Sequence, residues 1–68
     1  MHIIITDGMG NNTKKEIAGD ELTGKEVMHK LGISLFEGTI IKNGEIVRES
    51  EILSSRDEIK ILKMIHGG

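Results

Sequence analysis

Residues 22–32 read Leu-Thr-Gly-Lys-Glu-Val-Met-His-Lys-Leu-Gly, and this stretch decides the fold because it predicts one short helix among strands. Thr23 lies three residues before Glu26, the spacing of a capping box, in which each side chain bonds to the other residue's backbone N–H. Glu26 and Lys30 have the i,i+4 spacing of an ion pair on a helix surface. Gly32 supplies the stop signal, so we predict a helix of about two to three turns.

One face of this helix is apolar. Val27, Met28 and Leu31 recur at helical spacing, which predicts the side that packs on the core. Leu22, just before the cap, and Val27, four residues inside, have the arrangement of a hydrophobic staple.

Two strands are predicted before the helix. The β-branched run His2–Thr6 predicts a strand that ends at the turn Asp7-Gly8, and residues 8–12 predict a flexible loop. Residues 13–18 are mostly polar and predict an edge strand that returns antiparallel to the first. The charged side chains at positions 14–16 would keep that edge from pairing with other molecules.

Three strands are predicted after the helix. Residues 39–42 and 45–47 flank Asn43-Gly44, a strong signal for a two-residue hairpin turn. Residues 48–55 predict a polar connection, pinned to the core by Ile52 and Leu53. Residues 58–65 predict the last strand, whose side chains alternate between two faces: Ile59 and Ile61 on one, and Lys60, Leu62 and Met64 on the other.

The order strand, strand, helix, strand, strand, strand predicts an α+β fold of the β-grasp type. One helix buries the apolar side chains only if it lies across one face of a single sheet, here a mixed sheet of four to five strands. First and last strands lying side by side and parallel satisfy the right-handed crossover rule. We expect residues 1–66 to form the domain and residues 67–68 to form a flexible C-terminal tail.

The tail Gly67-Gly68 is the candidate functional feature. A terminal glycine pair adds nothing to stability, but without Cβ atoms an extended tail fits a narrow enzyme channel. Its carboxylate suits activation by ATP to an acyl-adenylate, followed by attack of sulfur or nitrogen on the acyl carbon. The protein would be the substrate of that reaction and not its catalyst.

Composition argues against several function classes. A chain of 68 residues allows one domain with a thin core, which disfavours a deep active-site cleft, and no catalytic constellation stands out. A net charge of −2 with both signs interspersed predicts no nucleic-acid binding and no membrane anchor. We expect a soluble, cytoplasmic protein that is monomeric when free. The histidines lie on separate elements without ligand spacing, so no metal site is predicted: His2, His29 and His66.

Three stretches carry a resemblance to a known family: residues 41–47, residues 57–61 and the terminal Gly67-Gly68. In these the chain resembles the ubiquitin-like sulfur-carrier family, which includes the thiamine-synthesis sulfur carrier, the small subunit of molybdopterin synthase and archaeal small modifier proteins. One departure is Arg56, since family members often have Gly directly before the Asp that opens the last strand. The expected turn geometry at that position is therefore open.

The resemblance implies a ubiquitin-like β-grasp fold and a chemistry for the tail. An adenylating enzyme resembling the ubiquitin activators would use ATP to activate the Gly68 carboxylate, with Gly67 as the access residue. A sulfur donor would convert it to a thiocarboxylate, which delivers sulfur to a biosynthetic enzyme. The carrier itself would bind no cofactor.

An apolar patch of Ile41, Leu62 and Met64 is a candidate docking site for the activating enzyme. These side chains face away from the helix if Ile59 and Ile61 face it. Scattered exposed aliphatic residues are the alternative interpretation. A register slip of one residue would invert the assignment.

Two other functions remain open. A ubiquitin-like modifier would use the same tail, with Gly68 linked to lysines of other proteins. A β-grasp binding module with an inert tail would make the same fold without the chemistry. The pathway that a sulfur carrier would serve also stays open among thiamine, molybdopterin, tRNA thiolation and amino-acid sulfur supply.

Overall fold

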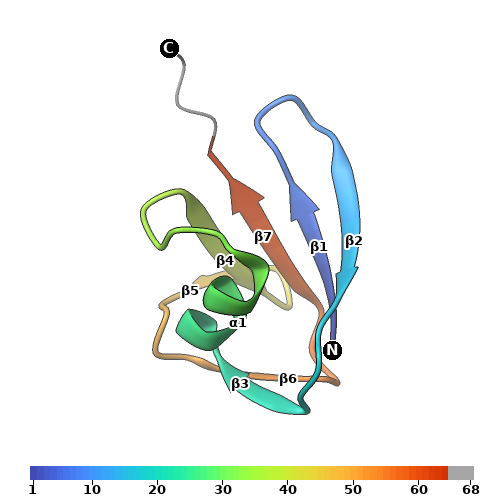
Figure 1. The fold of residues 1–68 in the computed structure, drawn as a ribbon, viewed down its shortest axis with the longest axis vertical. Coiled ribbons are helices and arrows are strands. Elements are labelled where there is room, and N and C mark those ends of the chain that lie inside the picture. The colour runs from blue at the N-terminus through green and yellow to red at the C-terminus, as the bar shows by residue number, and fades with distance from the viewer. Residues whose placement is uncertain (65–68) are drawn as a thin grey trace.

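The computed structural model describes residues 1–64, which form one helix and seven strands (Figure 1). The helix α1 spans Gly24–Leu31. The strands are β1 (His2–Thr6), β2 (Asn12–Glu16), β3 (Glu21–Thr23), β4 (Gly38–Lys42), β5 (Glu45–Val47), β6 (Ile52–Ser54) and β7 (Ile59–Lys63).

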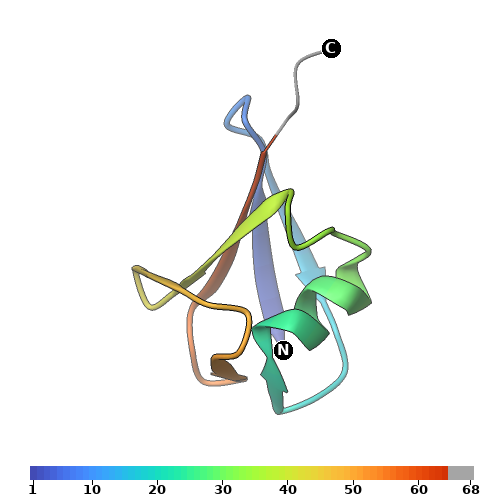
Figure 2. The same ribbon diagram turned by 90° about the vertical axis from the view of Figure 1, so that its left-hand side faces the viewer.

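The main sheet has five strands in the order β2-β1-β7-β4-β5. β1 and β7 run parallel in its centre, with Ile5 opposite Ile61, and the other pairings are antiparallel. The helix lies on one side of this sheet (Figure 2). The mixed sheet with one helix confirms the predicted α+β β-grasp fold.

A second, two-stranded sheet was not expected from the sequence. β3 pairs antiparallel with β6, and Leu22 lies opposite Leu53. The prediction that both Ile52 and Leu53 pin this connection to the core is wrong for Ile52. Leu53 is fully buried, whereas Ile52 is 53% exposed, because successive side chains of a strand point to opposite sides.

The predicted capping box is present. The Glu26 N–H donates to Thr23 Oγ1 at 3.1 Å, and the Thr23 N–H donates to Glu26 Oε1 at 3.0 Å. The Glu26 carboxylate accepts from the Thr23 N–H and from the Thr23 hydroxyl, and these two bonds lower the pKa of the Glu26 carboxyl. Because the carboxylate is held at the cap, the expected ion pair with Lys30 does not form. Gly32 ends the helix in the left-handed region, with φ of +71°, as its stop signal predicts.

The core lies between α1 and one face of the main sheet. Val27 and Met28 from the helix pack with β-branched residues of the three central strands, and Leu31 lies half-buried at the margin. The sheet contributes Ile3, Ile40, Ile59 and Ile61, and the remaining buried hydrophobic residues are Ile33 and Leu53.

The strand ends differ from the predicted bounds by one or two residues. β2 ends at Glu16, and Ile17 continues its pairing with β1, since the Ile17 N–H donates to the Met1 carbonyl at 3.0 Å and the Met1 amino group donates to the Ile17 carbonyl at 2.8 Å. β7 ends at Lys63, one residue before the last described residue, Met64.

Candidate functional site: the tail end and the open face of the sheet

The central strand β7 leads towards the C-terminal residues. After β7 the Met64 N–H donates to the Glu37 carbonyl at 2.6 Å, which extends the pairing with β4 by one residue. The candidate reactive residue, Gly68, and its neighbour Gly67 lie outside the described residues. Their base is therefore a strand held on both sides, by β1 and by β4.

The three predicted docking residues lie at the open side of the sheet. Ile41 and Leu62 alternate with the buried Ile40 and Ile61, so they face away from α1, and both are half-buried. Met64 follows at the end of β7 and is 54% exposed.

Ile41 and Leu62 are not direct cross-strand partners. Ile41 lies opposite Lys60, and Leu62 lies opposite Thr39, so the two apolar side chains are diagonal neighbours. Lys60 consequently places a cation within the apolar patch.

Two further aliphatic residues belong to this face and were missed from the sequence. Ile46 lies directly opposite Ile41 and is 76% exposed, and Ile4 lies opposite Lys60 on the other side of β7. Both residues could have been assigned to this face from the sequence, by the length of the turn and by the alternation of side chains along a strand. A two-residue turn pairs Lys42 with Glu45 and hence Ile41 with Ile46, and Ile4 alternates with the buried Ile3.

The loop between β1 and β2 lies at the end of the sheet where β7 finishes. Residues 8–12 were predicted to be flexible, but Asp7 binds this loop together. Asp7 Oδ1 accepts from the N–H groups of Met9 and Asn11, both at 2.9 Å, and the Gly10 N–H donates to the Asp7 carbonyl. The bond from the Asn11 N–H is the main cause that lowers the pKa of the Asp7 carboxyl. This loop lines a shallow hollow with Leu62 and Met64.

The opposite end of the sheet is held by a polar cluster. Asp57 Oδ2 accepts from the Ser54 N–H at 2.8 Å, and Asp57 Oδ1 accepts from Asn43 Nδ2 at 3.1 Å. Lys42 Nζ lies 3.1 Å from Glu51 Oε2 and 3.9 Å from Asp57 Oδ2. These contacts tie the β4–β5 hairpin to the turn that precedes β7.

The turn at Arg56 does not need the glycine that the resemblance implied. Asn43 is the one non-glycine residue with a positive φ among residues 1–64, so Arg56 lies outside the region that favours Gly. Asn43 and Gly44, with φ of 50° and 84°, form the hairpin turn that the sequence predicts.

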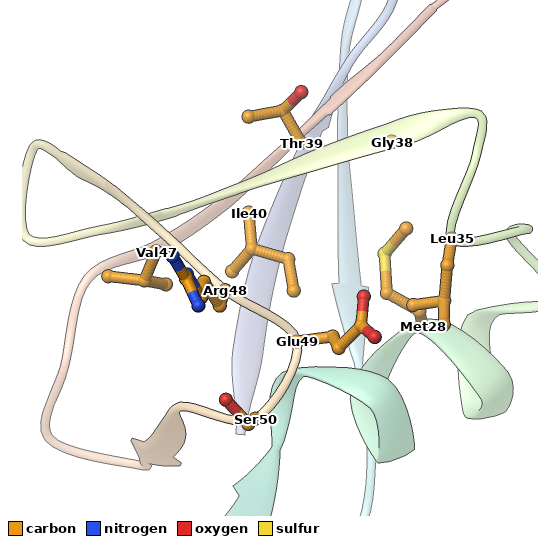
Figure 3. Close-up of a pocket in the computed structure, with 9 residues that line it drawn as sticks. All are labelled: Met28, Leu35, Gly38, Thr39, Ile40, Val47, Arg48, Glu49 and Ser50. Atoms are coloured by element: carbon orange, nitrogen blue, oxygen red, sulfur yellow. The ribbon is translucent and has the colours of Figure 1, made fainter.

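A gap opens between α1 and the β4–β5 edge (Figure 3). Met28, Ile40 and Val47 line its apolar part, and Arg48 and Glu49 line its polar part. The polar groups that line it include no histidine or cysteine that could act as a base or nucleophile. The lining also includes the hydroxyls of Thr39 and Ser50, so it is part apolar and part polar.

Two further kinds of feature were sought in the described part of the chain, a metal-ligand cluster and a membrane-spanning helix. Within residues 1–64, no three His, Cys, Asp or Glu side chains converge on a point where a metal ion could sit. Over the same residues, no helix has the length and apolar character that a membrane crossing requires.

Comparison with known proteins gives one family. The model described as the ThiS family matches residues 7–68, nearly the whole chain. The comparison with curated proteins gave no match.

Proposed function

Because the chain belongs to the ThiS family, whose ubiquitin-like β-grasp members are sulfur carriers and not catalysts, we propose that its sulfur is carried at the carboxylate of Gly68. One structural observation supports the assignment. β7 lies between β1 and β4, so the segment that continues from it towards Gly68 starts from a firmly paired base. A partner enzyme can therefore bind the folded domain while it acts on the residues that follow β7.

The proposed chemistry has two steps, both on partner enzymes. A carboxylate oxygen of Gly68 attacks the α-phosphorus of ATP, and pyrophosphate leaves with the electrons of the broken P–O bond. Hydrosulfide from the sulfur donor then attacks the acyl carbon, AMP leaves with the electrons of the C–O bond, and the S–H proton is lost. The product is a thiocarboxylate, from which the sulfur passes to a biosynthetic enzyme. The carrier contributes the reacting group, and Gly67 gives it narrow access.

The open face of the sheet supports a docking role for the same proposal. Ile41, Leu62 and Met64 would contact the adenylating enzyme, with Ile46 extending the patch across β5. Lys60 lies among them, so the complementary surface should pair apolar side chains with a carboxylate. Family membership itself implies an activating enzyme and a sulfur-accepting enzyme as partners.

Deletion of Gly68 tests the proposal. The truncated carboxylate would lie about 3.5 Å short of its productive place, since one extended residue spans that distance. We expect adenylation, measured as ATP–pyrophosphate exchange by the adenylating enzyme of the host, to fall below detection. The circular dichroism spectrum and thermal midpoint should match those of the full chain. Exchange at the rate of the full chain would contradict the proposal.

The two alternatives predict different products. A modifier would leave Gly68 in isopeptide bonds to lysines of other proteins, detectable as Gly-Gly remnants after proteolysis of host extract. A binding module with an inert tail would keep every partner interaction after deletion of residues 67–68.

A further inference from the structure

Large apolar side chains lie exposed at the end of the sheet from which residue 65 continues. Met9 is 79% exposed, Phe36 is 92% exposed and Met64 is 54% exposed. The topology places them at the same end of the sheet, because β1 and β7 both finish there and the antiparallel β4 begins there (Figure 1), and Met9 and Met64 line one hollow. Phe36 is the only aromatic residue of the chain. Phe is among the aromatic residues that are enriched in protein–protein interfaces relative to the rest of the surface.

Both loops that present these side chains are held in shape. Asp7 accepts the N–H groups of the Met9 loop, as described above. In the segment before β4, the Phe36 N–H donates to Ser34 Oγ at 3.2 Å, and the Glu37 N–H donates to the Ser34 carbonyl at 2.9 Å. Phe36 is thus displayed on an ordered turn. A preorganised side chain loses less entropy when it binds a partner.

The number of residues between this end of the sheet and Gly68 limits how far from Met64 a partner enzyme can bind. Residues 65–68 span at most about 14 Å when fully extended. An enzyme that acts on the Gly68 carboxylate must bring the mouth of its active site within that distance of Met64. Glu37, next to Phe36 in the chain, is hydrogen-bonded to Met64, so the segment that carries Phe36 runs beside the start of the tail.

We propose that Met9, Phe36 and Met64 form an apolar collar around the base of the tail, and that Phe36 anchors the adenylating enzyme by filling an apolar pocket beside its active-site mouth. The proposal rests on the proposed function, because it needs an enzyme that acts on Gly68. The collar extends the contact from the open face of the sheet to the loop before β4. Phe36 then determines which enzymes accept this carrier.

The test compares Phe36→Ala and Met9→Ala with a matched control, Ile52→Ala. Ile52 is likewise an apolar residue with an exposed side chain, 53% exposed, but it lies on β6 at the other end of the molecule (Figure 1). The KM and kcat for each carrier variant are measured by ATP–pyrophosphate exchange with the adenylating enzyme of the host. We expect Phe36→Ala to raise KM by about fivefold or more with kcat unchanged, the pattern of lost binding. Met9→Ala should raise KM less, Phe36→Leu should restore part of the loss, and Ile52→Ala should leave KM unchanged.

The outcomes separate this inference from the proposed function. If the wild-type chain supports exchange and Phe36→Ala has the same KM, the collar is wrong and the proposed function stands. If the wild-type chain supports no exchange, the proposed function fails and the collar falls with it. Equal thermal midpoints for all variants exclude misfolding as the cause of a raised KM. A dimer of the free chain that depends on Phe36, together with an unchanged KM, would assign this side chain to self-association and overturn the collar.

Discussion

The two ends of the five-stranded sheet use their side chains in opposite ways. At the end where β7 begins, Lys42, Asn43 and Asp57 bond to one another or to backbone groups of β6. At the end where β7 finishes, Met9 and Phe36 contribute almost no buried area to the fold. Side chains that stabilise the fold and side chains that are available for recognition therefore lie at opposite ends of the strands. Changes at the first end should alter unfolding, and changes at the second should alter binding.

The largest expected effect is on the core that joins the two ends. Ile61 is fully buried in the central strand β7, so Ile61→Ala should lower the free energy of unfolding by about 2–5 kcal/mol. Urea unfolding followed by circular dichroism measures this loss. In conditions where the variant remains folded, its KM in the exchange assay should match that of the wild type. A raised KM in the fully folded variant would contradict the separation of stability from partner binding.

A smaller effect on stability is expected at the polar end. Asp57→Ala removes the acceptor of the Ser54 N–H and of Asn43 Nδ2, and should lower the thermal midpoint by less than Ile61→Ala does. Its KM in the exchange assay should stay unchanged. Asp57→Asn, which keeps the size of the side chain, is the matched variant for separating charge from shape.

The same carboxylate gives a pH dependence with a defined sign. The bond from the Ser54 N–H is the main cause that lowers the pKa of Asp57 below its ordinary value of 3.8. Its contribution to stability is therefore complete above that ordinary value and is lost as the pH falls through the lower folded value. Asp57→Ala should lack this part of the acid dependence in thermal unfolding followed from pH 5 downwards. An unchanged dependence would show that other carboxylates cause it.

The smallest expected effect is on the open face. Leu62 is half-buried, and Leu62→Ala should raise KM by about two- to threefold, since each side chain outside an interface hot spot contributes little. Ile46→Ala tests how far the contact extends over β5. If Leu62→Ala left KM unchanged while Ile52→Ala raised it, the docking surface would lie at the other end of the molecule.

Features set by local signals could be predicted from the sequence. The helix follows from Thr23, Glu26 and Gly32, and the hairpin follows from Asn43-Gly44, because each requires only neighbours in the chain. The parallel pairing of the first and last strands was expected because it satisfies the right-handed crossover rule, and the structure has it.

Features set by pairing between distant segments could not be predicted from the sequence. β3 and β6 are three-residue strands whose partners lie far apart in sequence, and neither has the alternation that marks a longer strand. The Arg56 turn was left open because its support comes from Asp57 and not from a glycine. Nothing in residues 33–37 indicates that Phe36 is exposed, because the stretch has no regular period. For the candidate site, Gly68, Ile41, Leu62 and Met64 were predicted from the sequence, whereas Ile4, Ile46 and the loops that carry Met9 and Phe36 came from the structure.

The central claim is tested most directly by the intact mass of the protein purified from its own host without reducing agents or hydroxylamine. We predict a species in which one oxygen of the Gly68 carboxylate is replaced by sulfur, located at the C-terminus by fragmentation. The claim would be contradicted by an ordinary carboxylate that persists after incubation with ATP, a sulfur donor and the adenylating enzyme of the host.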